Sequence, residues 1–496
     1  MRPRLTVVGD VLLDRDVVGT VERVCPDAPV PVVDGVVERT RPGGAGLAAW
    51  LASRDGADVT LIAAFADDPA AAELRMRLDA ASIHVLAMQR GGATPEKTRV
   101  RAGAQSIVRV DRGDARGVTT GADIRALTDA LTASSAILVS DYGGGVTYDR
   151  TVRQCLAAAA ERVPVVWDPH PRGTKPVPGC TVVTPNRAEA LGAAEALGAA
   201  ATRAHGPDPA AGGRVATTAR AARALLTVWD AEAVCVTLGA DGAALVRGPN
   251  GVVVVPAPAV NPVDVCGAGD RFATAVALAL ADRLPVGEAV AHAVSIASTF
   301  VSVGAGWPSE RTSARERTLP AAGAGDGAAA PSTARATPTH ARRDRQSRPL
   351  VVATSGCFDL LHAGHVRMLR AARGLGDRLV VCLNDDGSVA RLKGPARPIV
   401  PVEERAEVVL ALDCVDDVVV FVEDTPERVL AELRPDIFAK GADYTIEQLP
   451  EARLLASWGG ETVILPYEAG RSTTELIARS RHSSRDYSRR FQRSAR

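Results

Sequence analysis

The sequence predicts two α/β domains: a large doubly wound parallel sheet with a small β lid, followed by a smaller Rossmann-like α/β domain. Three observations predict this architecture: the length, the alternation of apolar runs with Ala-rich stretches, and a polar segment between two such regions. The chain has 496 residues, whereas one hydrophobic core rarely grows beyond about 250–300 residues. At least two domains are therefore expected.

The first region, residues 1–306, alternates Val/Ile/Leu-rich runs with helical stretches. Runs such as "LTVVGDVLL", "SAILVSDY" and "VPVVWDPH" are apolar throughout, as in parallel strands that are buried on both faces. Two other stretches, "PVPVVDGVVERT" and "EKTRVRAGAQSIVRVDRG", alternate polar and apolar residues. Half-exposed antiparallel strands have this pattern, which predicts a small lid sheet beside the main sheet.

The second region starts after a change in composition. Residues 307–347 are rich in Ala, Pro, Thr, Gly and Arg and have almost no large apolar side chains, which predicts a disordered linker. Residues 348–480 resume the α/β pattern with "RPLVVATSG" and "GDRLVVCLN". The basic end, residues 481–496, is predicted to be a disordered tail.

Charge and composition limit the partners. The formal net charge is +0, with 46% hydrophobic and 23% charged residues, so nothing in bulk charge favours nucleic acid or an anionic membrane. The N-terminal apolar run is too short for a signal peptide, and no run reaches the roughly 18 apolar residues of a membrane span. Eight cysteines without a C-x-x-C pair are typical of buried thiols in a reducing cytoplasm.

The stretch "NPVDVCGAGDRFATAVALAL" indicates phosphoryl transfer. Gly267, Ala268 and Gly269 lead into an apolar helix that is expected to begin near Asp270, so backbone amides can converge on an anion at the positive helix end. Asp270 would take the proton of an attacking hydroxyl while these amides stabilise the transferring phosphoryl group. A tight turn capped by Asp would give a similar pattern, so the turn alone does not decide.

This motif resembles the D-T-x-G-A-G-D signature of the ribokinase-like sugar kinases, and the resemblance covers residues 5–306. It implies a ribokinase-like fold with Asp270 as the catalytic base. The resemblance further implies roles for matching positions in "GDVLLDR", "RPGGAG", "TPNRAE" and "VTLGADGA": sugar binding by Asp10, Asp14, Gly43 and Gly44, Mg²⁺ and phosphate binding by Asn186 and Glu189, and nucleotide binding by Thr237, Gly239 and Gly242.

Within that family the N-terminal third resembles heptose 7-phosphate kinases, through "VVGDVLLDRDVVGTVERVCPDAPVPVV", "EKTRV" and "QSIVRVD". The resemblance implies that the lid brings Lys97, Arg99 and Arg109 to a phosphorylated sugar. Three positions depart from the family pattern: Leu47 stands where the family has Asn, and Gly144 and His170 stand where it has Lys. Either the sugar differs, or other residues compensate, or the kinase is slow.

The stretch "GCFDLLHAGH" places His362 and His365 at an expected strand-to-helix turn. An i, i+3 histidine pair can bind a metal, but a metal site needs further ligands, and none follow at a clear spacing. Phosphate is the alternative, because imidazoles donate hydrogen bonds, Gly364 permits close backbone approach, and a helix starts here. Such a site suits a transition state at the α-phosphate of a nucleotide.

The same stretch resembles the H-x-G-H signature of the cytidylyltransferase-like nucleotidyltransferases, over residues 350–480. The resemblance implies catalytic roles for His362, His365 and Lys393, without a covalent intermediate. It implies nucleotide or phosphate contacts, including those in "NDDGSVARLKG", "AKGADY" and "GRSTTELI", from Cys357, Phe358, Asn384, Asp386, Arg405, Lys440, Gly441, Ser472, Thr473 and Thr474.

The order of sugar kinase, linker and transferase resembles the bifunctional enzymes that make ADP-heptose. The resemblance implies O1 phosphorylation of D-glycero-β-D-manno-heptose 7-phosphate, adenylyl transfer to heptose 1-phosphate, ATP as co-substrate, Mg²⁺ as cofactor, and a cytoplasmic homodimer formed through the lid. The expected partners are small molecules. Two alternatives stay open: the same reactions on another sugar phosphate, or an active transferase with an inactive kinase-like domain. ATP and CTP are not distinguished by the sequence.

Overall fold

The computed structural model describes residues 2–103, 105–114, 116–117, 119–197, 214–248, 252–258, 260–304, 349–441 and 449–465. The predicted linker, residues 307–347, and the predicted tail, residues 481–496, lie outside the described residues. Within the described ranges, no helix has both the length and the apolar character that crossing a membrane requires.

The main sheet of the first domain is formed by strands β1 (Arg4–Gly9), β4 (Asp58–Phe65), β5 (His84–Arg90), β8 (Thr119–Thr120), β9 (Ala136–Ser140), β10 (Val165–Asp168), β11 (Val182–Val183), β12 (Val234–Thr237), β13 (Ala243–Val246) and β14 (Val252–Val255). The neighbours from β12 through β11, β10, β9, β1 and β4 to β5 pair in parallel. Antiparallel strands flank this block, with β13 and β14 on one side and β8 on the other. The predicted parallel sheet is confirmed.

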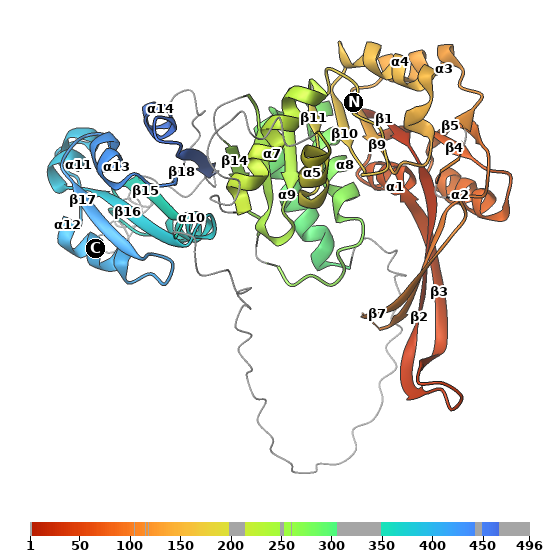
Figure 1. The fold of residues 1–496 in the computed structure, drawn as a ribbon, viewed down its shortest axis with the longest axis horizontal. Helices are drawn as coiled ribbons and strands as arrows, with labels where there is room; N and C mark the ends of the chain where they lie inside the picture. The colour runs from red at the N-terminus through yellow and green to blue at the C-terminus, as the bar shows by residue number, and fades with distance from the viewer. Residues whose placement is uncertain are drawn as a thin grey trace, which may run out of the picture.

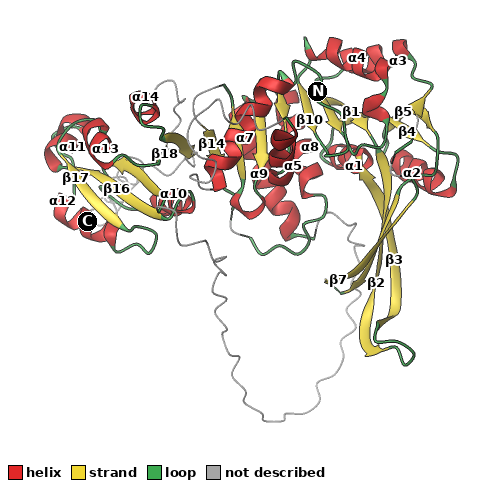
Figure 2. Cartoon of the chain, in the orientation of Figure 1, coloured by secondary structure: helices red, strands yellow, loops and turns green. Residues whose placement is uncertain are grey.

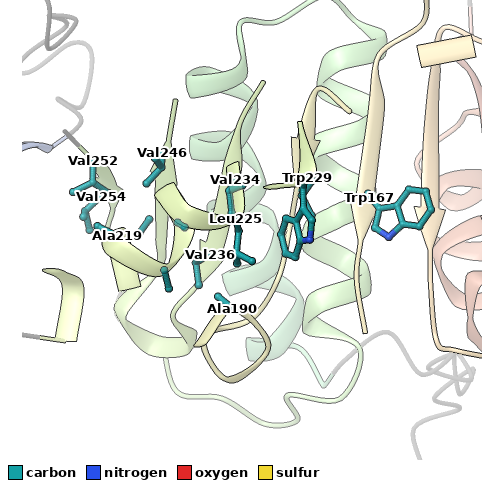
Figure 3. Packing of buried hydrophobic residues seen from close by; sticks show 14 of the residues in the cluster. Trp167, Ala190, Ala219, Leu225, Trp229, Val234, Val236, Val246, Val252 and Val254 are labelled. Atoms are coloured by element: carbon teal, nitrogen blue, oxygen red, sulfur yellow. The ribbon is translucent and has the colours of Figure 1, made fainter. Parts of the chain in front are cut away.

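Helices cover both faces of this sheet (Figure 2). Along β9, Leu138 belongs to a first hydrophobic core, whereas Ile137 and Val139 belong to a second core on the opposite face of the sheet. Burial on both faces explains why the strand is apolar throughout. Figure 3 shows part of the second core, from Trp167 to Val252. The first core packs on α1 (Ala45–Arg54), α2 (Pro69–Ala80), α8 (Ala268–Ala281) and α9 (Val286–Ser302); the second packs on α3 (Ile124–Thr132), α4 (Arg150–Ala160), α5 (Arg187–Ala196) and α7 (Arg214–Trp229).

The predicted lid is a separate four-stranded sheet of β2 (Val11–Val24), β3 (Pro31–Gly44), β6 (Glu96–Ala102) and β7 (Gln105–Arg112), in the order β3-β2-β6-β7. Its long β2–β3 ribbon extends away from the main sheet (Figure 1). The register places Asp14 opposite Lys97 and Asp16 opposite Arg99. Because side chains alternate along strands, these charged residues share one face of the lid. Strand β2, which carries Asp14 and Asp16, begins two residues after β1 ends.

The second domain has the expected Rossmann-like pattern. Its strands β15 (Val351–Gly356), β16 (Arg378–Asn384), β17 (Asp417–Phe421), β18 (Ile437–Gly441) and β19 (Glu461–Leu465) are parallel, in the order β17-β16-β15-β18-β19. Leu369 and Val409 pack on one face, and Leu430 and Leu455 pack on the other. These residues belong to α10 (Ala363–Gly374), α12 (Val402–Leu410), α13 (Glu427–Leu433) and α14 (Pro450–Ala456), while α11 (Asp386–Lys393) follows β16.

One continuous sheet joins the two domains, and no local pattern in the sequence predicts it. Strand β14 pairs in parallel with β19, with Val252 opposite Val463 and Val253 opposite Ile464. Beside this junction, Arg223 Nη1 lies 2.8 Å from Glu461 Oε1. Because β14 is antiparallel to β13, and β13 to β12, the strands of both parallel blocks run in the same direction.

Separate replacement of Arg223 and Glu461 by Ala, and their joint replacement, should show a coupling of about 0.5 kcal/mol in the free energy of unfolding, because the pair is partly exposed. The measurement is a double-mutant cycle by chemical denaturation. As a control, Arg223→Ala combined with Glu232→Ala, an exposed residue, should be additive. Additivity of the Arg223 and Glu461 changes would contradict the ion pair beside the junction.

Candidate active sites

Both candidate sites lie at the carboxyl ends of parallel strands. Asp10 follows β1, Tyr142 lies just beyond β9, and Asp168 ends β10; Cys357 follows β15 and Asn384 ends β16. The carboxyl ends of parallel strands share one edge of a sheet, where loops form binding crevices. Since the two parallel blocks run in the same direction, both sites lie along the same edge of the joint sheet.

The glycine-rich loop leads into α8 as predicted, two residues before Asp270. Gly267 is the N-cap of the helix and has a φ of 83°, a left-handed conformation that favours glycine. A β-carbon there would lie 2.8 Å from Leu47 Cδ2, so the loop rests directly on the first helix. Gly269 has open space around it. The first turn of α8 is therefore a compact amide loop that an anion can approach.

Asp270 is buried in the first turn of α8, at 6% exposure. Burial raises the pKa of its carboxyl group to about 7, and the nearby Asp14 carboxylate acts in the same direction, while Tyr142, Arg41 and Lys97 lower it. The Tyr142 hydroxyl lies 3.0 Å from each carboxylate oxygen of Asp270. A carboxylate that titrates near neutral pH is suited to general base catalysis.

Asp10 and Asp14 are both buried at the sheet edge but have different neighbours. Asp10 accepts hydrogen bonds from the backbone amides of Tyr142, Gly144 and Val146, at 2.8–3.1 Å, so it organises the turn after β9. Asp14 Oδ1 accepts from Arg99 Nη1 at 2.8 Å. The predicted pair Gly43 and Gly44 lies against these residues, since β-carbons there would approach Asp14 Oδ2 at 2.8 Å and the Asp10 carbonyl oxygen at 2.5 Å.

The lid brings several cations to this edge. Lys97 Nζ lies 5.1 Å above the centre of the Tyr142 ring, and Arg101 Nη1 lies 2.8 Å from Asp264 Oδ2 in the loop before α8. Arg109 is the cross-strand neighbour of Arg99, but it is exposed, and its guanidinium pairs with Asp111. Lys97 is a predicted lid cation that lowers the pKa of the Asp270 carboxyl group.

The predicted nucleotide residues gather at the ends of β11 and β12. Asn186 and Glu189 form a capping box at the start of α5, in which each side chain accepts from the other residue's amide. A backbone bridge joins Asn186 to Thr237. Gly239 begins the short 3₁₀ helix η3 (Gly239–Asp241) and Gly242 follows it, with φ values of 65° and 93°. These predicted residues therefore lie close together.

The three departures from the sugar kinase pattern have structural counterparts. Leu47 is buried with Leu51 and Phe300 beneath the Gly267 loop, so it supports that loop by packing. Gly144 has no room for a side chain, because a β-carbon would lie 2.8 Å from Asp10 Cγ. The His170 ring stacks on Tyr142 with centroids 5.8 Å apart. Burial lowers the pKa of His170, and Arg172 and Lys97 lower it further.

His362 and His365 come together at the start of α10. Their rings stack with centroids 3.9 Å apart. The Gly364 amide donates to His362 Nδ1 at 3.1 Å, so a neutral His362 carries its proton on Nε2. Burial, together with His362 and Lys393, lowers the pKa of His365 to about 4. Neutral imidazoles donate hydrogen bonds without adding charge, and no group of three or more metal-ligating side chains occurs among the described residues.

Arg405 connects the loops of the second site. Its guanidinium is 2% exposed and donates to the carbonyl oxygens of Cys357, Asn384 and Val400, and to Asp386 Oδ1, at 2.6–3.0 Å. Because Arg405 is buried and donates to carbonyl oxygens of three separate segments, it holds the loops after β15 and β16 in place around the site. The predicted nucleotide contacts Cys357, Asn384 and Asp386 are held in one network by this residue.

The other predicted residues of the second site have mixed surroundings. Phe358 has a φ of 43°, and its ring centroid lies 5.3 Å from that of His365. Lys440 Nζ pairs with the buried Glu451 at 3.1 Å, and Gly441 lies against Met368. Lys393 ends α11 and acts electrostatically on His365. Ser472, Thr473 and Thr474 lie outside the described residues.

Sequence reasoning missed three side chains at the first site: Tyr142, Asp168 and Arg41. Tyr142 and Asp168 follow or end buried apolar runs, and polar residues at the carboxyl ends of parallel strands were the signal that could have found them. Arg41 is the cross-strand neighbour of Asp14, and its Nη2 lies 3.4 Å from Cys266 Sγ. Only the strand register could have revealed this contact.

Comparisons with known proteins match two parts of the chain to two different families. Residues 2–310 match the pfkB family carbohydrate kinases, and residues 353–479 match the cytidylyltransferase-like family. The bifunctional protein HldE of Streptomyces coelicolor is 49% identical over 98% of this chain and 98% of that protein. The bifunctional protein HldE of Azorhizobium caulinodans is 38% identical over 96% and 98%. The tetrameric inhibited form of phosphofructokinase-2 from Escherichia coli aligns with a TM-score of 0.46 and 19% identity, covering 61% of this chain and 95% of that chain.

Replacement of Arg405 by Met should lower the free energy of unfolding by about 3 kcal/mol, because buried carbonyl groups lose their charged donor. The measurement is chemical denaturation of the full chain. Arg391→Met is the matched control, since the Arg391–Asp424 pair is about half exposed, and should leave the free energy of unfolding nearly unchanged. Equal effects of the two changes would contradict the role of Arg405.

Proposed function

This chain belongs to the family of bifunctional HldE proteins, and from that premise we propose that it catalyses two steps of ADP-heptose biosynthesis. In the first step, ATP phosphorylates O1 of D-glycero-β-D-manno-heptose 7-phosphate. In the second, heptose 1-phosphate receives the adenylyl group of ATP, and pyrophosphate leaves. A separate phosphatase must remove the 7-phosphate between the two steps. We place both reactions in the cytoplasm.

The observation that carries the kinase assignment is the buried Asp270 carboxylate beside the amide loop of α8. Asp270 accepts the proton of the sugar O1 hydroxyl, O1 forms a bond to the γ-phosphorus of ATP, and the bond from that phosphorus to ADP breaks. The Gly267–Gly269 amides stabilise charge on the transferring group. Lys97, above the Tyr142 ring, contributes a positive charge from the lid to bind the phosphorylated sugar.

Magnesium enters this proposal with ATP, and the chemistry of the donor set fits it. Burial and the nearby carboxylates of Asp270 and Glu189 raise the pKa of Asp168 well above its ordinary value. A divalent cation would stabilise the ionised forms of these neighbouring carboxylates. Mg²⁺ prefers oxygen ligands while keeping several waters. Asn186 and Glu189 would hold the ion through water. When bound, it neutralises charge on the ATP phosphates.

The adenylyl transfer assignment rests on the stacked His362 and His365 at the start of α10. An oxygen of heptose 1-phosphate attacks the α-phosphorus of ATP, and the bond from that phosphorus to pyrophosphate breaks. The His362 imidazole donates a hydrogen bond from Nε2 to an α-phosphate oxygen, the stacked His365 ring holds His362 in place, and Lys393 adds positive charge. The helix start contributes in the same direction. No covalent enzyme intermediate forms, because the protein supplies position and charge.

The test is product analysis with the full chain. Heptose 7-phosphate and ATP should yield ADP and a bisphosphate, and heptose 1-phosphate with ATP should yield ADP-heptose by mass spectrometry. CTP in place of ATP should yield no nucleotide sugar. ADP release with another sugar phosphate but not with heptose 7-phosphate would overturn the substrate assignment and would connect Gly144 and His170 to a different sugar.

Two variants should separate the activities. Asp270→Asn should lower the kinase rate about 10³-fold, because the base is lost, and should leave adenylyl transfer unchanged. His365→Ala should lower adenylyl transfer about 10²-fold or more and should leave ADP release by the kinase unchanged. Each activity is the folding control for the other. Kinase activity that persists in Asp270→Asn would remove Asp270 from the mechanism.

We propose further that the chain forms a homodimer through the lid. The charged lid face carries Asp16, Arg99 and Arg101, and the opposite face carries Val100 opposite Val108 and Thr98 opposite Val110. Val108 and Val110 are 49% and 39% exposed. An exposed apolar sheet face is typical of a surface that a partner covers, and a second copy supplies the same face around a two-fold axis.

Light scattering should give twice the monomer mass of 51.5 kDa for the unmodified chain. Val108→Asp should shift the particle toward the monomer, because charges would then be buried in the dimer interface. Ile124→Asp, at an exposed apolar residue of α3, is the control and should leave the mass unchanged. A monomeric unmodified chain would refute the dimer.

A further inference from the structure

Tyr142 lies at the centre of the kinase site, although neither the family signature nor its spacing assigns it a role. It follows β9 in the sequence "SDYGGG". Its amide donates to Asp10 Oδ2 at 3.1 Å, and its ring lies against Gly44, where a β-carbon would come within 3.3 Å. The backbone and the ring are thus both held in place.

The other sides of the ring are also occupied. His170 stacks on it at 5.8 Å with an interplanar angle of 24°, and Lys97 Nζ lies 5.1 Å from its centre. These contacts fix the position of the ring, and therefore also the position of the Tyr142 hydroxyl. It lies 3.0 Å from both Oδ1 and Oδ2 of Asp270, so its single proton is shared between the two oxygens.

We propose that Tyr142 is the positioning residue of the kinase base: its hydroxyl orients the Asp270 carboxylate and stabilises the ionised form that accepts the sugar proton. This inference rests on the proposed role of Asp270. Tyr142 itself keeps its proton throughout, because burial and the neighbouring carboxylate of Asp270 raise its pKa well above the ordinary value. The proton from the sugar goes to Asp270, and Tyr142 remains a neutral donor.

The charges around Asp270 come from several elements. Burial has the largest effect on the pKa of Asp270, and the Tyr142 hydroxyl acts against it. Burial disfavours the ionised carboxylate, and a hydrogen bond to the charged form opposes burial. The groups that face Asp270 are Asp14 of β2, Arg41 of β3, Lys97 of β6, Tyr142 of the loop after β9, and Asp168 of β10. Removal of the hydroxyl leaves the other groups in place, so the pKa of Asp270 should rise.

The experiment compares kinase kcat/KM of the unmodified chain, Tyr142→Phe and Tyr148→Phe from pH 6 to pH 9. A hydrogen bond to a charged group is worth about one pKa unit or more. The ratio of Tyr142→Phe to the unmodified chain should therefore fall from near one at pH 9 to about one tenth at pH 6. Titration of the substrate phosphate, with a pKa of about 6, cancels in this ratio.

Tyr148→Phe is the matched control, because the Tyr148 hydroxyl donates to the Arg172 carbonyl at 2.8 Å and not to Asp270. It should leave the pH profile unchanged, and adenylyl transfer should be unchanged in both variants. A loss in Tyr142→Phe that is equal at every pH, or the same shift in Tyr148→Phe, would overturn the inference. Kinase activity in Asp270→Asn would instead overturn the base assignment on which the inference rests.

Discussion

The parallel alignment of strands in one sheet is the constraint on which both candidate sites depend. Parallel strands carry their loops to a common edge, and the pairing of β14 with β19 extends that edge across both domains. Asp270 and the two histidines are separated by more than 90 positions in the chain, yet both sites open from the same edge. A chain that uses ATP twice therefore presents two candidate phosphate sites on one scaffold.

Opposed electrostatic effects set the character of each site. At the first site, burial and Asp14 favour the neutral form of Asp270, while Tyr142, Arg41 and Lys97 favour the ionised form, and the result is a carboxylate that titrates near neutral pH. At the second site, burial and two neighbouring groups keep His365 neutral. The first site thus suits proton transfer, and the second suits hydrogen bonding to phosphate without a proton change.

Residues around the sites also carry structural duties that motif matching does not distinguish. Asp10 holds the turn after β9, Arg405 ties three carbonyl groups together, and Asn186 with Glu189 caps α5. In each case the side chain satisfies buried or terminal backbone groups, which would otherwise cost free energy. Loss of activity after mutation at these positions would therefore combine loss of a contact with disorder of a loop.

Local patterns in the sequence determined the two α/β domains, the lid strands, the amide loop before Asp270 and the turn with His362 and His365, because periodicity, glycines and caps act over a few residues. Tertiary structure decided the rest. The contact of Tyr142 with Asp270, the fit of Gly144 against Asp10, the burial of Arg405 and the β14–β19 junction each join segments far apart in the chain. Their geometry depends on strand register and on which side chains burial brings together, and neither is encoded in local spacing.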